Sequence, residues 1–342
     1  MLLDESFESE QANSTSSLSL LATWEKRRDH LAQRASICLD HSLAAHGLRS
    51  MRITIATSQG AAGLANRGQF AAGLALTSGR PYEGYFFARS HTNESVRMRV
   101  ALVDWRHGRT LAATDLLVPS SGQLAFTGAA FSQITFQLPP LSAGAGCSDD
   151  GRCNGEFVLL ALGLADVSVD FVVLQPGAWS RFAGLPVLSS AVETLRAMGV
   201  STVRFGGSFA TGLSRNTEME WERWRGPPWL RPSVADSCWP HWRAGHWHAE
   251  WCSVLSGWGP FEFLALAEAA GWLPVLATTG GSSAHSLANL VEYCLGNASS
   301  PLGRQRHLDG HPTPYPLRYI ELGNEVGVLP RVRTGCRGRW RC

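Results

Sequence analysis

The segment Tyr315-Pro-Leu-Arg-Tyr-Ile-Glu-Leu-Gly-Asn-Glu325 is a short apolar run that ends in a glycine, an asparagine and a glutamate. Tyr, Ile and Leu bounded by Pro and Gly are typical of a buried strand. In a barrel of parallel strands, the carboxyl ends of the strands carry the active site. A carboxyl group held there can keep its proton near neutral pH and donate it to a leaving oxygen. The alternative is that Glu325 only caps a following helix.

The residues from 177 to 325 repeat one pattern, in which a helix with one apolar face is followed by a glycine stop, a strand and a glycine-rich loop. Gly199 and Gly271 lie where a left-handed residue would end a helix. Strands are expected at 200–205, 273–279 and 319–325. The apolar faces of the three expected helices consist of Leu188, Ala191, Val192, Leu195 and Met198, then Phe263, Leu264, Ala267 and Ala270, then Leu287, Leu290, Val291 and Cys294. This alternation predicts a parallel α/β structure.

The residues from about 51 to 176 follow a period of two instead. Val96, Met98, Val100 and Leu102 alternate with more polar neighbours, and 134–138 does the same. Further strand-like runs cover 85–89, 157–162 and 167–174, and clusters of Gly, Ser, Pro and Asn separate them. Many short strands with no helix between them predict an antiparallel sandwich or jelly roll.

The composition is that of an ordinary globular protein, because charged residues make up 17% and hydrophobic residues 44% of 342. The formal net charge is +2, but five arginines lie in residues 326–342 and the rest of the chain is mildly acidic. No basic patch of the kind that follows a phosphate backbone is visible. Neither a nucleic-acid partner nor a membrane partner is expected, and no apolar stretch is long enough to span a bilayer.

Cysteines and sequons bear on the cellular compartment. Cys147 and Cys153 flank a tight Ser-Asp-Asp-Gly-Arg turn, where a small disulfide loop is expected. Sequons begin at Asn13, Asn93 and Asn297 and fit a secreted protein. The N-terminus is acidic and has no apolar signal region, so the chain as written carries no signal peptide. The expectation is an extracellular location for a full-length protein.

Several motifs, in order and at matching spacing over roughly residues 50–325, resemble the α-L-arabinofuranosidases of glycoside hydrolase family 51. The stretch 167–176 is similar to the strand that closes that family's sandwich. The other matching segments are Val203-Arg-Phe-Gly-Gly-Ser-Phe-Ala-Thr-Gly212, Asn289-Leu-Val-Glu-Tyr-Cys294, Gly303-Arg-Gln-Arg306, Gly310-His-Pro-Thr-Pro-Tyr315 and 319–325.

The resemblance implies roles for six residues. Glu325 would be the general acid/base at the end of the fourth barrel strand, and Asn324 would bind the 2-hydroxyl of the sugar. Arg204, Gly206, Gly207 and Ser208 would help to build the arabinose subsite. The family retains configuration, so a second carboxylate is needed about 5–5.5 Å away as nucleophile. The resemblance places that nucleophile on the seventh strand, which is absent from the chain, and implies no cofactor and no metal.

The implied architecture is a carbohydrate-binding-module-like β-sandwich (jelly roll) at 51–176, followed by a partial (β/α)8 TIM barrel at 177–325. Residues 1–50 stay without an assignment. The chain departs from the family at Gly206, where the family has Pro, and at Ser208, where it has Asn or Cys. Strands five to eight are missing, and 326–342 is interpreted as out-of-frame or intron-derived translation, with a basic interaction tail as the alternative.

The expected function is that of a retaining glycoside hydrolase. It would remove terminal α-L-arabinofuranosyl groups from arabinose-containing polysaccharides or glycoproteins, and would be inactive as the truncated chain. The alternative is a non-catalytic truncated product or carbohydrate-binding protein.

Other chemistry-bearing residues have competing interpretations. One stretch has the residue types of a zinc site, namely Cys238, His241, His246, His248 and Cys252, but their spacing fits no standard zinc finger. The alternatives are a loop that faces the sugar or an ordinary packed loop. Glu218, Glu220 and Glu222 are interpreted as a solvated charge run. Glu321 lies about 13 Å along the strand from Glu325 and is interpreted as a buried structural carboxylate or a contact at the bottom of the barrel. His311 is expected to be structural, and Asp149 and Asp150 are expected to form a plain turn rather than a calcium site.

Overall fold

The computed structural model describes residues 7, 24–68, 71–123, 130–142, 147–206, 220–231, 258–278 and 282–324. The chain divides into two compact units. The first comprises Met1–Leu195 and Pro227–Trp258, and the second comprises Arg196–Gly226 and Gly259–Cys342. In the described ranges, no helix is long and apolar enough to cross a membrane.

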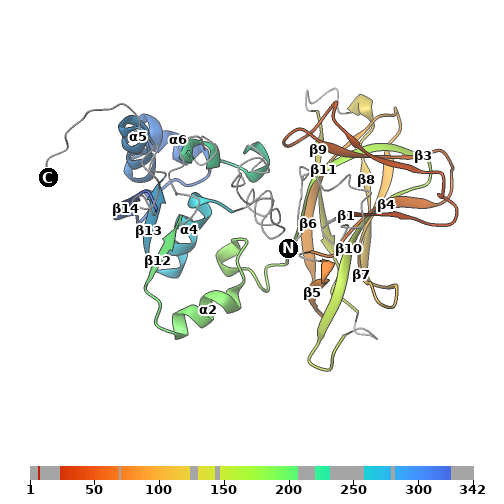
Figure 1. The fold of residues 1–342 in the computed structure, drawn as a ribbon, viewed down its shortest axis with the longest axis horizontal. Helices are drawn as coiled ribbons and strands as arrows, with labels where there is room; N and C mark the ends of the chain where they lie inside the picture. Colours follow the sequence, from red (N-terminus) through yellow and green to blue (C-terminus); the bar gives the residue numbers. More distant parts are fainter. Residues whose placement is uncertain are drawn as a thin grey trace, which may run out of the picture. The chain divides into compact units, whose positions relative to one another are not determined.

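The first unit consists of two antiparallel sheets, as Figure 1 shows. One sheet has the order β1-β4-β10-β7-β8, with β5 paired to β10, and the other has the order β2-β3-β11-β6-β9. Their strands are β1 (Trp24–Arg28), β2 (Ser36–Asp40), β3 (Ser50–Ile55), β4 (Ala61–Asn66), β5 (Leu74–Thr77), β6 (Tyr82–Ser90), β7 (Val96–Asp104), β8 (Arg109–Val118), β9 (Ser132–Leu138), β10 (Arg152–Leu162) and β11 (Ala165–Pro176). The sandwich-like arrangement predicted from the period of two is confirmed.

The core lies between the two sheets and is built by alternation. Val96, Met98, Val100 and Leu102 of β7 are all at most 2% exposed, whereas the arginines between them reach solvent. Successive side chains of a strand point to opposite faces, so this alternation puts one apolar row inside. Each fully buried aliphatic side chain contributes roughly 1.5–3 kcal/mol through burial.

Two details of the first unit were not predicted. β1 and β2 lie before residue 51, in the stretch that the sequence analysis left without an assignment. Residues 121–123 are helical, so the expectation of no helix between the strands was wrong there. Strands β1 and β2 have no strong local sequence signal, because each is only five residues long. Pairing with β4 and β3, respectively, holds them in the extended conformation.

A bulge in β11 organises one end of the first unit. Its register shifts between Asp170 and Val173, and Phe171 has a positive φ of 45°. The buried Asp170 carboxylate accepts backbone N–H bonds from Ala45, His46 and Phe171, at 2.7, 2.9 and 2.7 Å. Three hydrogen bonds to one carboxylate offset the cost of the unfavourable φ, which is roughly 1–3 kcal/mol.

His46 at this bulge makes the first unit sensitive to acid. The ring is 4% exposed and packs edge-on against Phe171. Burial, opposed by a backbone hydrogen bond with Arg231, lowers the pKa of His46 to about 4. Between pH 6.5 and about 4, His46 is protonated in the unfolded chain but stays neutral in the folded chain. The free energy of unfolding that is present above pH 6.5 is therefore lost as the pH falls toward 4. The expected loss is roughly 3 kcal/mol.

The measurement is urea unfolding of the first unit at pH 7 and pH 4.5, in the original protein and in His46→Leu. The variant should lose about 2–3 kcal/mol less than the original protein between the two pH values. His30→Gln, at an exposed position of the same unit, is the matched control and should keep the full pH dependence. An equal acid loss in the original protein and His46→Leu would show that other groups cause it.

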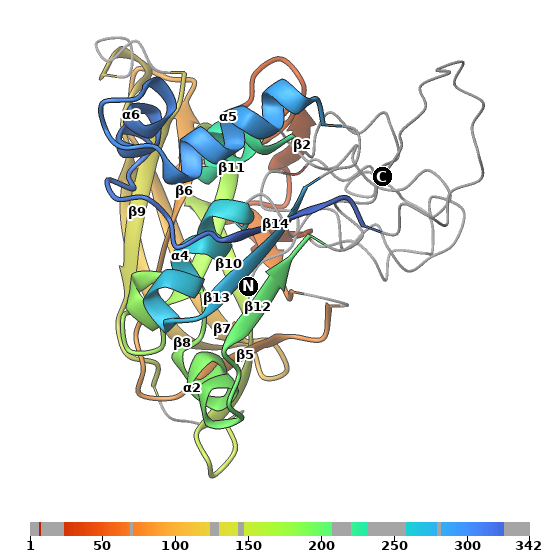
Figure 2. The same ribbon diagram turned by 90° about the vertical axis from the view of Figure 1, so that its left-hand side faces the viewer.

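The second unit contains a parallel sheet with the order β12-β13-β14, whose strands are β12 (Thr202–Phe205), β13 (Leu273–Thr278) and β14 (Tyr319–Leu322). Figure 2 shows these strands side by side. The longer α-helices of the described residues are α4 (Pro260–Ala270), α5 (Ala284–Leu295) and α6 (Pro301–Leu308) in this unit, and α2 (Ser189–Ala197), of which residues 189–195 belong to the first unit. The short 3-10 helices of the described residues are η4 (Phe182–Gly184), η7 (Trp221–Trp224) and η8 (Pro228–Leu230). Helix α4 contacts β12 and β13, and Phe263 stacks on Phe205.

The glycine stops are where the sequence predicted them. Gly199 and Gly271 have φ values of 80° and 71°, which are left-handed conformations that glycine adopts without strain. The apolar face predicted for α2 was wrong for most of its members. Val192 is buried, but Leu195 is 38% and Met198 is 73% exposed. Helix α6 was not predicted, because its mean hydropathy is low, although Ser300 and the proline after it are a helix-start signal.

Candidate functional site

The sheet of the second unit places Arg204 and Glu321 on the same face. Arg204 of β12 is the register partner of Val275, and Glu321 of β14 is the partner of Ala277. Val275 and Ala277 are two residues apart on β13, so their side chains and those of their partners point to one side. Adjacent strands lie about 4.8 Å apart, so Arg204 has to reach across roughly 10 Å to meet Glu321.

The two side chains form a two-point ion pair. Arg204 Nε lies 2.6 Å from Glu321 Oε2, and Arg204 Nη2 lies 2.9 Å from Glu321 Oε1. The hydrogen bond to Glu321 raises the pKa of Arg204, and the same bond lowers the pKa of Glu321. Both side chains are about two-fifths exposed, at 42% and 40%. Water therefore weakens the attraction between the two charges. The two-point pair fixes the orientation of the Arg204 guanidinium more than it stabilises the fold.

Asn324 joins this pair immediately beyond β14. Arg204 Nη2 donates to Asn324 Oδ1 at 2.9 Å. The backbone is held by Gly323, whose N–H donates to Thr278 O at 2.9 Å. The sheet thus brings together two residues that the sequence assigned to one sugar subsite and that are 120 positions apart.

Gly206 follows β12 at a position where a side chain has no room. Its φ is 133°, and a Cβ there would lie 2.5 Å from the Ala277 Cβ. A proline, which the related family has here, fixes φ near −65° and cannot adopt this conformation. The turn after β12 therefore depends on glycine.

Three of the six predicted site residues, Gly207, Ser208 and Glu325, lie outside the described residues, and so does the Cys238–Cys252 series. The roles predicted for them stay predictions.

Two interpretations of carboxylates need correction. Glu321 is not a buried carboxylate, because it is 40% exposed and paired with Arg204. Glu222 is not simply solvated, because its Oε1 accepts a hydrogen bond from Ser286 at 2.9 Å. Sequence spacing locates a side chain along its own strand or helix, and it does not show which distant group lies beside it.

Helices α5 and α6 are joined by a polar network, to which the motif segments 289–294 and 303–306 contribute Tyr293 and Gln305. Asp309 accepts hydrogen bonds from Tyr293 at 2.8 Å, Gln305 at 2.9 Å and Arg225 at 2.8 Å. Burial raises the pKa of Tyr293, so this hydroxyl stays a donor. Sequence reasoning missed the network, although its tyrosine and glutamine lie in motifs that were recognised.

His311 lies in the loop after α6 and has a structural set of contacts, as expected. Its ring stacks on Tyr315 at 3.9 Å, Nε2 lies 2.7 Å from Glu268 Oε2, and Nδ1 lies 2.7 Å from Thr313 O.

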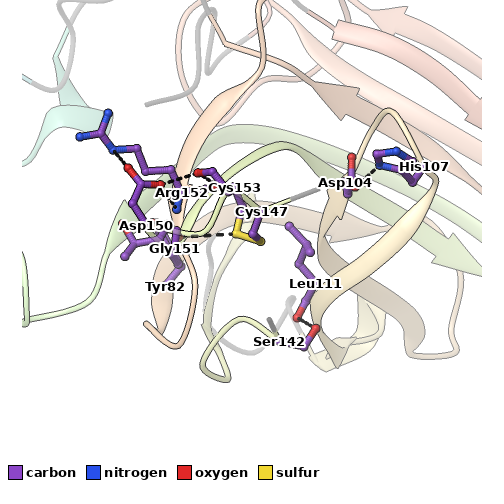
Figure 3. The surroundings of a disulfide bond; sticks show 12 residues. Tyr82, Asp104, His107, Leu111, Ser142, Cys147, Asp150, Gly151, Arg152 and Cys153 are labelled. Carbon is purple, nitrogen blue, oxygen red and sulfur yellow. Dashed lines mark hydrogen bonds and ion pairs between the residues drawn. A yellow bond between two sulfur atoms is a disulfide. The ribbon is translucent and has the colours of Figure 1, made fainter. Parts of the chain in front are cut away.

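The expected disulfide links Cys147 to Cys153 in the first unit (Figure 3). The acidic turn between them is closed by Gly151 N–H donating to Ser148 O at 2.8 Å, and Asp150 pairs with Arg152 at 3.1 Å. These contacts close the turn that the sequence predicted.

Comparisons with known proteins agree with the geometry. Residues 194–340 match the family model described as "Alpha-L-arabinofuranosidase 1 domain". A probable alpha-L-arabinofuranosidase A of Aspergillus niger is 28% identical over 158 residues, which are 43% of this chain and 24% of that protein. Alpha-L-arabinofuranosidase 1 of Arabidopsis thaliana is 27% identical over 137 residues, 36% of this chain and 19% of that protein. The chain therefore spans a quarter or less of these relatives.

The fold is similar to that of a solved structure, an arabinose-bound MgGH51 α-L-arabinofuranosidase. The TM-score is 0.69 at 22% identity, over 95% of this chain and 50% of the other. Motif order and the family model agree, and over part of its length the chain is similar to α-L-arabinofuranosidases.

Proposed function

We propose that the second unit supplies the acid/base half of a retaining α-L-arabinofuranosidase site, and that residues 177–325 form part of a (β/α)8 barrel. The observation that carries this is the 2.9 Å hydrogen bond between Arg204 and Asn324 at the carboxyl ends of β12 and β14. These are the positions at which parallel barrels hold their catalytic residues. Glu325 follows Asn324 directly in the chain.

In the proposed reaction, Asn324 binds the 2-hydroxyl of the sugar, and Arg204, Gly206, Gly207 and Ser208 build the arabinose subsite. Glu325 donates a proton to the leaving oxygen and later removes one from the incoming water. A second carboxylate, about 5–5.5 Å from the first, attacks the anomeric carbon and forms the covalent intermediate, so configuration is retained. Glu321 does not suit that second role, because its carboxylate is engaged by Arg204.

The proposed substrates are arabinose-containing polysaccharides or glycoproteins, cut at terminal α-L-arabinofuranosyl groups. No cofactor is part of the proposal. The disulfide and the sequons at exposed Asn93 and Asn297 support an extracellular setting and a glycoprotein.

Residues 1–342 on their own are expected to show no measurable hydrolysis of an aryl α-L-arabinofuranoside, because one free carboxylate cannot act as both acid and nucleophile. The assay measures the nitrophenol that the purified protein releases from a nitrophenyl arabinofuranoside, with Glu325→Gln assayed in parallel. Robust turnover that Glu325→Gln abolishes would show that a nucleophile is present within the chain. A chain that binds arabinofuranosides without turnover in any longer form would favour the non-catalytic carbohydrate-binding alternative.

A further inference from the structure

One cluster of aromatic side chains lies outside the core, on the outer face of the sheet β2-β3-β11-β6-β9. Phe86 of β6 belongs to the core between the two sheets, so its neighbours Tyr85 and Phe87 point outward. Phe171 of β11 packs against both outward rings, with centroid distances of 6.3 and 6.4 Å. Phe171 is only 1% exposed. Other residues must therefore cover this cluster on its outer side.

Residues 227–231, which we call the strap, supply part of this cover. They include the 3-10 helix η8 and belong to the first unit. The centroid of the Trp229 ring lies 5.4 Å from that of Tyr85 and 5.7 Å from that of Phe87. Leu230, the next residue, is 73% exposed. Trp229 is therefore the apolar side chain that anchors the strap.

His46 makes the second contact with the strap. Its ring packs at 4.8 Å against Phe171, and a hydrogen bond with the Arg231 backbone raises its pKa. An acceptor has this effect on a donating ring, so the ring N–H donates to the Arg231 carbonyl oxygen. The charged side chains next to these contacts are Asp170 of β11, which accepts the His46 backbone N–H at 2.9 Å, and Arg231 itself. Burial has the largest effect, and it lowers the pKa of His46 to about 4.

Detachment of the strap would change the surroundings of the His46 ring. A single 3-10 turn is not stable alone, so the strap keeps its shape only through its contacts with the first unit. Without the strap, the ring loses the Arg231 carbonyl and part of its cover, and water can reach it. An exposed histidine ionises near its ordinary pKa of 6.5. The closed strap is therefore stabilised above pH 6.5, and this stabilisation is lost as the pH falls toward 4.

We propose that the strap is an acid-sensitive conformational device, in which protonation of His46 releases residues 227–231 from the outer face of a sandwich that stays folded. The inference goes beyond the proposed function and does not rest on it. An exposed histidine is mostly neutral at pH 7 and almost fully protonated at pH 5. The equilibrium constant for opening should therefore be roughly twentyfold larger at pH 5 than at pH 7.

The experiment is native-state hydrogen exchange of the strap amides, followed by NMR in residues 1–342. The Leu230 and Arg231 N–H groups donate to Pro227 O at 3.0 Å and Pro228 O at 3.2 Å, and these bonds are lost when the turn opens. After correction for intrinsic exchange rates, the opening constant should rise roughly twentyfold from pH 7 to pH 5. Low concentrations of urea should hardly change it, whereas amides of β7, which exchange through unfolding of the whole unit, should respond strongly.

Three variants separate His46 from other sources of pH dependence. His46→Gln keeps an N–H donor for the Arg231 carbonyl but does not titrate, so opening should no longer depend on pH. His91→Gln is the matched control, because His91 is a half-buried histidine whose Nε2 lies 2.8 Å from Ser168 Oγ of β11. It should keep the twentyfold response. Trp229→Phe should increase opening at both pH values and keep their ratio.

A twentyfold rise that urea does not change, that His46→Gln removes and that His91→Gln keeps would support the proposal. Equal opening at pH 7 and pH 5 in the original protein would overturn it, and so would an unchanged response in His46→Gln. A urea dependence equal to that of β7 would also overturn it, because the strap would then open only with the whole unit. If His46→Gln does not fold, the pH profile of the original protein decides, since opening has to increase below pH 6.5 and level off near pH 4.

Discussion

Replacing Glu325 by alanine should slow hydrolysis of alkyl arabinofuranosides by roughly 10²–10⁴-fold, in a protein that unites this residue with the second carboxylate. An alkoxide is a poor leaving group and needs the proton that Glu325 would donate. A nitrophenolate leaves without much protonation, so the first step with an aryl substrate should suffer far less. Glu325 follows Asn324 directly in the chain, and Asn324 accepts a hydrogen bond from Arg204 at the end of β14.

The measurement is a paired comparison of kcat/KM for alkyl and aryl substrates in the original enzyme and Glu325→Ala. Added azide should partly restore turnover of the aryl substrate, because a small anion attacks the covalent intermediate without a general base. The first-formed product, followed by NMR, should keep the configuration of the substrate. Equal losses for both leaving groups, or an inverted product, would remove Glu325 from the acid/base role.

Replacing the buried Arg306 by methionine should destabilise the second unit by roughly 3–5 kcal/mol. Arg306 is 0% exposed. Its Nη1 donates to Tyr293 O and Gly296 O, both at 2.8 Å, and its Nε donates to His311 O at 3.1 Å. The first of these carbonyls lies in the last turn of α5, where helical partners are absent and the helix dipole is negative. Methionine fills part of the space but leaves buried carbonyls without donors.

The measurement is hydrogen exchange of residues 284–308 together with urea unfolding. Arg304→Met is the matched control, because Arg304 is exposed on the same helix, and it should change stability by no more than about 0.5 kcal/mol. Arg306→Lys should lie between the two, since an ammonium keeps the charge but cannot reach several separated carbonyls. Similar exchange in Arg306→Met and Arg304→Met would mean that α5 does not depend on the buried guanidinium.

The amino-acid sequence by itself determined the features that depend on neighbours in the chain. The alternation of Val96, Met98, Val100 and Leu102 predicted a half-buried strand, since every second side chain enters the core. Gly199 and Gly271 predicted helix ends, since a left-handed residue costs glycine nothing. The close pair Cys147 and Cys153 predicted its own disulfide across a tight turn.

Tertiary structure decided the features that depend on groups far apart in the chain. The bulge at Phe171 exists because the Asp170 carboxylate captures N–H groups of Ala45 and His46. Motif order placed Arg204 and Asn324 in one subsite. Only the three-stranded sheet shows that Arg204 donates hydrogen bonds both to Asn324 and to Glu321. Spacing along a strand gives the direction of a side chain. Its partner is selected by strand order and register, which bring β12 and β14 to either side of β13 and let a charged fork form across it.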